Sequence, residues 1–199
     1  MKKREYFDKV KKTVDEGFTE YKEKLKKYNE LKKEREEGHF SLEYLNNDIL
    51  PKMNGLRQEM RSTQEKTLEK VRELTEEIKN EISKSDQIKP EELTEDVKLL
   101  QGGLSLREKD IEGIIERNEN NRSMIQLALR YAEEHNLKVD TLYISGESEL
   151  RQFDEIGNAI GTVVKWFDTD NERYYQRIYD TVFSEGSGAS QVCSDQEEE

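Results

Sequence analysis

The chain has 199 residues, of which 32% are hydrophobic and 39% are charged, and its net charge is −12. Soluble domains average about 45–50% apolar and about 25% charged residues, so this composition excludes a single compact core of ordinary size. The charge is uneven, since residues 1–37 carry 13 basic and 10 acidic residues whereas the remainder carries 20 basic and 35 acidic residues. The acidic remainder argues against phosphate-directed binding to nucleic acid, with the basic residues 1–37 as a narrow exception.

Cysteine use and apolar run length indicate the compartment. Cys193 is the only cysteine, which fits a reducing environment. No apolar run approaches the roughly 18 residues of a transmembrane helix, and the stretch MKKREYFDKV lacks the apolar centre of a signal peptide. We therefore expect a cytoplasmic protein with no membrane partner.

Two long amphipathic helices are predicted over residues 1–37 and 42–84, because apolar residues recur there in steps of three and four. The four residues Gly38-His39-Phe40-Ser41 between them are short enough for a hairpin, with Gly38 ending the first helix and Ser41 capping the second. Pro51 predicts a kink or restart near Leu50. The first seam is Phe7, Val10, Val14, Phe18, Tyr21, Leu25, Tyr28 and Leu31, and the second is Met53, Leu56, Met60, Thr63, Thr67, Val71, Leu74, Ile78 and Ile82.

These seams are thin, and Gly17, Thr63 and Thr67 interrupt them. A hairpin with so little apolar surface predicts a partner helix, either from a second copy or from another protein. Three tyrosines near the end of the chain are further interface candidates, because amphipathic aromatics are enriched at protein interfaces. The predicted interaction residues are Val14, Tyr21, Tyr28, Met53, Leu56, Met60, Leu74, Ile78, Tyr174, Tyr175 and Tyr179.

Residues 90–183 predict a compact helical unit, which completes an all-α fold of a coiled-coil-like hairpin arm (1–84) and a denser second part. Within it, Ser105 with Glu108 reads as a capping box, and Asn121 recaps a helix of high apolar content. Gly157 and Gly161 predict close helix packing against the helices of residues 90–136. Residues 184–199, rich in Gly, Ser and Glu, predict a disordered acidic tail.

The motifs that could carry chemistry have simpler structural explanations. His39 and His135 are the only histidines, too few with one cysteine for a structural zinc site. The Asp168-x-Asp170-Asn171 run begins like a calcium loop, but Arg173 and Tyr179 stand where glycine and glutamate are needed. Helices 106–117 and 121–135 have a helix-turn-helix outline, although Glu133 and Glu134 oppose DNA reading. We expect no catalytic, metal or cofactor site and no enzymatic activity.

Residues 99–135 carry a recognisable pattern: LLQGGLS at 99–105, DI at 110–111, RNENNRSM at 117–124 and YAEEH at 131–135. This resembles small uncharacterised helical proteins of phages and prophages of Gram-positive bacteria. The resemblance implies a virion-assembly setting in the host cytoplasm or on the virion, with a capsid or other virion protein as a possible partner beside the chain itself. We therefore expect a self-associating, scaffold-like assembly protein. The alternative is an acidic helical inhibitor or decoy of a host nucleic-acid-binding protein.

Overall fold

The computed structural model describes residues 1–141, 143, 145–169 and 171–194, and within them every regular element is a helix. The all-α prediction is confirmed. A π-helical turn spans Leu45–Ile49, and 3-10 turns span Pro90–Glu92 and Trp166–Asp168. The α-helices are α1 (Lys3–Glu37), α2 (Leu42–Tyr44), α3 (Leu50–Ser85), α4 (Val97–Gln101), α5 (Glu108–Arg117), α6 (Arg122–Glu134), α7 (Gly146–Lys165), α8 (Glu172–Phe183) and α9 (Gly188–Cys193).

The chain forms two compact units whose boundaries differ from the predicted ones. Unit 1 combines Met1–Ile78 with the segment from Gln152 onward, and unit 2 is Lys79–Arg151. The predicted division at residues 84–90 is wrong because the helices after residue 152 pack on the first hairpin rather than on the helices of residues 90–136. Unit 2 is thus inserted in the sequence of unit 1.

The hairpin of unit 1 is built as the sequence predicts. Gly38 follows α1 and donates its N–H to the carbonyl of Glu34 at 2.9 Å. Ser41 caps the return, because its hydroxyl accepts the N–H of Tyr44. The predicted interruption near Leu50 is the π-helical turn, in which the N–H of Leu50 donates to the carbonyl of Leu45. This wider turn lies directly before Pro51, whose missing N–H an ordinary helix would not tolerate in its interior.

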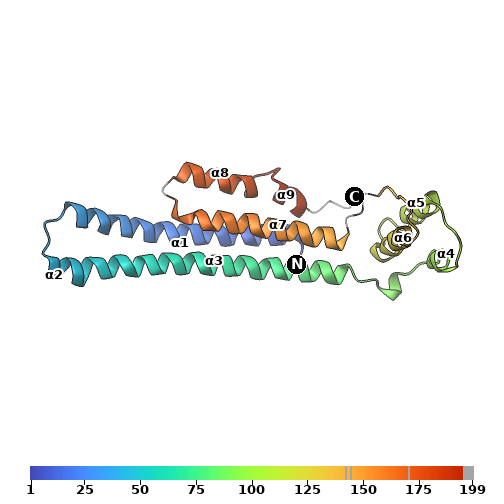
Figure 1. The fold of residues 1–199 in the computed structure, drawn as a ribbon, viewed down its shortest axis with the longest axis horizontal. Coiled ribbons are helices and arrows are strands. Elements are labelled where there is room, and N and C mark those ends of the chain that lie inside the picture. The colour runs from blue at the N-terminus through green and yellow to red at the C-terminus, as the bar shows by residue number, and fades with distance from the viewer. Residues whose placement is uncertain (142, 144, 170, 195–199) are drawn as a thin grey trace. The chain divides into compact units, whose positions relative to one another are not determined.

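Helices α7 and α8 cover one part of this hairpin (Figure 1). The ring of Phe153 on α7 packs edge-on against Tyr6 at 5.3 Å, and the amide of Gln64 donates to the carbonyl of Val164 at 2.8 Å. Helix α8 returns along α1, where Tyr175 stacks on Phe18 with centroids 3.8 Å apart. We call this covered part of unit 1 the body: residues 1–24, 61–78 and 152–194.

The hairpin continues beyond the end of α7 as two helices only (Figure 1). We call this part, residues 25–60, the arm. At the border of the body, the Lys22 ammonium on α1 donates to the carbonyl of Thr169 in the α7–α8 connection, at 3.2 Å. The predicted arm therefore exists, but it is shorter than residues 1–84 because the body uses the rest of both helices.

Residues 184–194 do not form the predicted disordered tail. Ser187 caps α9 by accepting the N–H of Ser190 at 3.1 Å, and it donates its own hydroxyl to the carbonyl of Val182 at 2.7 Å. Helix α9 packs on α1 and α8, and the Cys193 side chain is 1% exposed. The error arose because Gly and Ser, read as disorder, here supply a turn and a cap. Residues 195–199 lie outside the described residues.

Unit 2 has its own small core between α5 and α6. Its buried members are Ile111, Ile114, Met124, Ala128, Tyr131 and Ala132. Asn121 caps α6 as predicted, accepting the N–H of Met124 at 3.1 Å. The predicted Ser105–Glu108 capping box is wrong, because α5 begins only at Glu108 and Asp110 instead accepts the N–H of Arg107 at 2.9 Å.

Candidate interaction surface

The predicted interaction residues of the first hairpin fall into two groups. Val14, Tyr21, Met60 and Ile78 are 0%, 6%, 6% and 2% exposed, and Leu74 is half-buried. The seam residues Val14 and Tyr21 belong to the part of α1 that α7 and α8 cover. The prediction that this stretch of the seam meets a separate partner is therefore wrong for these two, because helices of the same chain fill that role.

Met60 is the last residue of the arm, and the remaining predicted residues of the hairpin lie within the arm. Tyr28 and Leu56 are half-buried, while Met53 is 3% exposed. The Tyr28 hydroxyl accepts a hydrogen bond from the guanidinium of Arg57, whose carbon lies 5.0 Å from the ring centroid. Within the arm, then, the two helices pack on each other and leave Leu56 partly open to solvent.

The interrupted part of the seam is a place where helices of the body approach closely. A Cβ atom at Gly17 would lie 2.2 Å from the Thr67 hydroxyl oxygen, and one at Gly157 would lie 3.2 Å from Thr75. The Thr67 and Thr75 hydroxyls donate to carbonyls one turn earlier, at 2.8 Å each, so neither is buried without a hydrogen bond. The small residues thus permit close packing, and Gly157 faces α3 rather than the helices of residues 90–136 as predicted.

A polar layer separates the body from the arm. The Lys24 ammonium donates to the Thr63 hydroxyl at 2.6 Å and also pairs with the Glu20 carboxylate. Thr63 in turn donates to Glu20 at 3.0 Å. The hydrogen bond from Lys24 holds the pKa of the Glu20 carboxyl below its usual value. Because Thr63 occupies a seam position and Lys24, beside the first seam, reaches across to it, this layer favours one register of the two helices.

Two of the three predicted tyrosines face inward. Tyr175 is 3% exposed, and burial raises the pKa of its hydroxyl. The Tyr179 hydroxyl donates to the Asp15 carboxylate at 2.6 Å. Burial is the main cause that raises the pKa of Tyr179, and the Asp15 carboxylate is the second. Tyr174 alone is open, at 44% exposure, with its ring edge-on to the exposed Trp166 at 5.0 Å. Tyr175 and Tyr179 thus hold α8 on α1, and only Tyr174 remains an interface candidate.

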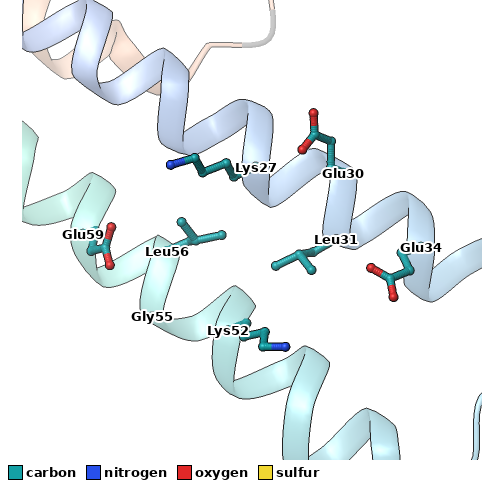
Figure 2. Close-up of a pocket in the computed structure, with 8 residues that line it drawn as sticks. All are labelled: Lys27, Glu30, Leu31, Glu34, Lys52, Gly55, Leu56 and Glu59. Atoms are coloured by element: carbon teal, nitrogen blue, oxygen red, sulfur yellow. The ribbon is translucent and has the colours of Figure 1, made fainter.

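The arm carries a groove of about 570 Å³ between its two helices. Figure 2 shows Leu31 and Leu56 extending into the space between the helices, with charged side chains along both edges. Both leucines are half-buried. The groove is lined by Lys27, Glu30, Leu31 and Glu34 from α1 and by Lys52, Gly55, Leu56 and Glu59 from α3. An apolar floor with charged edges is the pattern of a helix-pairing surface.

The residues of the histidine, calcium-like and helix-turn-helix patterns have structural roles. His135 stacks on Tyr131 with centroids 4.0 Å apart, and Asn171 caps α8 by accepting the N–H of Tyr174 at 3.1 Å. Asp170, part of the calcium-like run, lies outside the described residues. Arg122 is half-buried and bonds Glu149 at 2.8 Å and Asp86 at 3.2 Å, so it does not present its guanidinium to DNA.

Neither a metal centre nor a membrane span emerges from the described part of the chain. No group of three or more His, Cys, Asp or Glu side chains is placed there to hold a metal ion. Among the same residues, no helix combines the length and apolar character needed to cross a bilayer. Comparison of the chain with protein-family models, curated proteins and solved structures gave no match.

Proposed function

We propose that the protein is a non-enzymatic assembly protein that associates with copies of itself through the arm. The single observation that carries this proposal is the contrast along one hairpin. The same two helices are covered by α7 and α8 in the body and by nothing from the described part of unit 1 at the arm groove.

The arm is a poor candidate for an independently stable end of the molecule. Two helices can bury only one face of each other, and stable bundles need further helices to cover the seam. Leu31 and Leu56 stay partly exposed in the groove, and Leu42 at the hairpin turn is 78% exposed. Pairing with another arm would complete a four-helix arrangement like the one that α7 and α8 complete in the body.

The proposed setting is virion morphogenesis in a phage or prophage, with the host cytoplasm or the virion as its location. This part of the proposal rests on the resemblance of residues 99–135 to small phage proteins. A charged helical arm that pairs reversibly suits a scaffold-like role, because its thin apolar seam gives modest affinity per contact.

Sedimentation velocity from 1 to 100 µM tests self-association. We expect the wild-type chain to shift to larger species as concentration rises. The double variant Leu31→Asp/Leu56→Asp should remain the smallest species, because two carboxylates would have to be buried in the paired groove. The matched control is Leu42→Asp, the same substitution on the arm but outside the groove, and it should associate like the wild type.

A strictly monomeric wild-type chain at 100 µM would refute the proposal. Capture of a host nucleic-acid-binding protein by that monomer would then favour the acidic decoy instead. Circular dichroism of the wild type, the double variant and the Leu42→Asp control shows whether helix content is retained, so that a loss of association is not mistaken for unfolding.

A further inference from the structure

The charges along the arm groove follow a pattern that the proposed function alone does not require. On α1, Lys27 and Glu34 flank the level of Leu31, and on α3, Lys52 and Glu59 flank the level of Leu56. Each cation and anion are seven residues apart, which is two helical turns, so both stand on the groove side of their helix. The order is opposite on the two helices: Lys27 and Glu59 lie toward one end of the groove, and Glu34 and Lys52 toward the other (Figure 2).

Such an alternating square of charges is complementary to itself. A two-fold axis in the plane of the groove brings a second copy face to face and places every cation over an anion. If the two arms run in parallel, Lys27 meets Glu59 of the second copy and Lys52 meets its Glu34. If they run antiparallel, Lys27 meets Glu34 of the second copy and Lys52 meets its Glu59.

We infer that the arm groove is a homotypic docking site whose occupant is the same groove of a second copy of this chain, selected by these four charges. This inference rests on the proposed function, and it specifies the surface through which the chain self-associates and the charges that make that association selective. Leu31 and Leu56 supply the apolar centre, and the charges exclude helices with a different pattern, as edge charges do in coiled coils.

The charges are free to take part because their present contacts are weak. Lys52 lies 3.4 Å from Asp48 one turn earlier, and both side chains are about half exposed. Exposed pairs four residues apart on a helix contribute only about 0.3–0.5 kcal/mol, so Lys52 can exchange or share this partner at little cost. Unlike Lys24 in the polar layer, Lys52 is not fixed by a buried hydrogen bond.

Glu30, the fifth charge at the groove, favours one of the two orientations. It lies on α1 at nearly the same level as Leu31. In the antiparallel arrangement the two copies of α1 face each other, so the two Glu30 carboxylates meet near the axis and repel. In the parallel arrangement each Glu30 instead faces the Gly55–Leu56 level of α3, where no second carboxylate stands.

The experiment uses charge reversal in the full chain. Lys27→Glu/Lys52→Glu makes all four edge charges negative, and Glu34→Lys/Glu59→Lys makes all four positive. At about 50 mM salt each double variant should self-associate at least about tenfold more weakly than the wild type, because every cross-copy pair becomes repulsive. An equimolar mixture of the two should restore association to the wild-type level, measured by sedimentation velocity with one variant fluorescently labelled.

The fourfold variant Lys27→Glu/Glu34→Lys/Lys52→Glu/Glu59→Lys is the control for folding of the arm. It reverses every charge but keeps each cation across from an anion, both within one arm and between two identical arms. We expect it to self-associate like the wild type and to be excluded from mixed species with the wild type. A fourfold variant that mixes freely with wild-type chains would contradict charge selection.

The two possible failures are distinguishable. A monomeric wild-type chain overturns the proposed function and this inference with it. A wild-type chain that associates, with double variants that associate equally well or fail to recover on mixing, overturns only this inference. For orientation, recovery when Lys27→Glu is mixed with Glu59→Lys supports parallel arms, whereas recovery with Glu34→Lys supports antiparallel arms; both results support the homotypic site.

Discussion

The body and the arm are made of the same two helices, yet they are held together by different contacts. In the body, α1 packs its aromatic residues against α7, α8 and the turn between them, as in the contact of Phe18 with Phe167 of that turn at 5.5 Å. In the arm, the described contacts of α1 are with the returning half of the hairpin, the π-helical turn and α3, and its leucines remain partly exposed. A continuous apolar seam can therefore be buried in its own chain's core at one end, the body. At its other end, the arm, the same seam can stay open to a second chain.

Truncation of a core aromatic should show the largest difference between the two regions. Phe167 is fully buried and contacts Phe18, Tyr21 and Tyr175. Phe167→Ala should lower the free energy of unfolding by about 3–5 kcal/mol, because it removes buried ring surface and leaves a cavity. Urea unfolding followed by circular dichroism measures this loss.

The matched arm variant is Leu56→Ala, measured at a concentration where the chain is monomeric. Because Leu56 is already partly exposed, its truncation should cost less, about 1–2 kcal/mol. Equal losses of unfolding free energy for Phe167→Ala and Leu56→Ala would mean that the arm is packed as tightly as the body. The proposed difference between body and arm would then be wrong.

Alkaline pH should weaken the body through Tyr6. Burial raises the pKa of Tyr6 to about 12, against about 10 in an unfolded chain. The folded state thus holds this proton more tightly, so the stabilisation is fully present below pH 10 and is lost as pH rises through 12. The slope from this one group is up to about 1.4 kcal/mol per pH unit.

The variant Tyr6→Phe isolates that slope. It loses the hydrogen bond to Thr75, which lowers its starting stability by about 1 kcal/mol. Its unfolding free energy should nevertheless fall less steeply than that of the wild type between pH 10 and 12, measured by urea titration at half-unit steps. Parallel curves for the two proteins would show that Tyr6 ionises as freely in the folded body as in the unfolded chain.

The same small substitution should have opposite effects at two glycines of the hairpin. Gly17→Ala places a methyl group against the buried Thr67 and should destabilise the body by about 1–2 kcal/mol. Gly55→Ala meets nothing within 4 Å and should stabilise the arm helix by about 0.5–1 kcal/mol. Thermal melts of the two variants at low concentration give the sign directly, and a stabilising Gly17→Ala would show that the helices can separate there without cost.

Local features of the hairpin were predictable because they depend on neighbouring residues. The seam spacing, the turn at Gly38–Ser41, the interruption before Pro51 and the cap at Asn121 were all indicated by the sequence. Periodicity identifies the face of a helix that is buried but not the segment that buries it. For that reason Val14 and Tyr21 were assigned to a partner, although α7 and α8 of the same chain cover that face of α1.

The interaction surface was predictable only in part, for a related reason. Leu56 and Tyr28 were identified as interface residues, whereas Leu31 was noted only as a seam residue and the edge charges were not singled out. Seven-residue spacing of Lys27 with Glu34 and of Lys52 with Glu59 was visible in the sequence. The alternating charge pattern becomes evident only when α1 and α3 are placed side by side in their antiparallel register. The polar layer at Lys24 and Thr63 marks that register.

The position of unit 2 between α3 and α7 has a consequence for how the chain folds. Arg122 binds Asp86, just after α3, and Glu149, in the first turn of α7, so the entry and exit of unit 2 are held together. The entropy cost of closing a flexible loop rises with its length. Once unit 2 has folded, it joins α3 to α7 as a short preformed link instead of a long flexible coil. Most of the entropy cost of closing this loop has then been met before α7 packs on the hairpin. We therefore expect the speed with which the body forms to depend partly on Arg122, which lies outside the body.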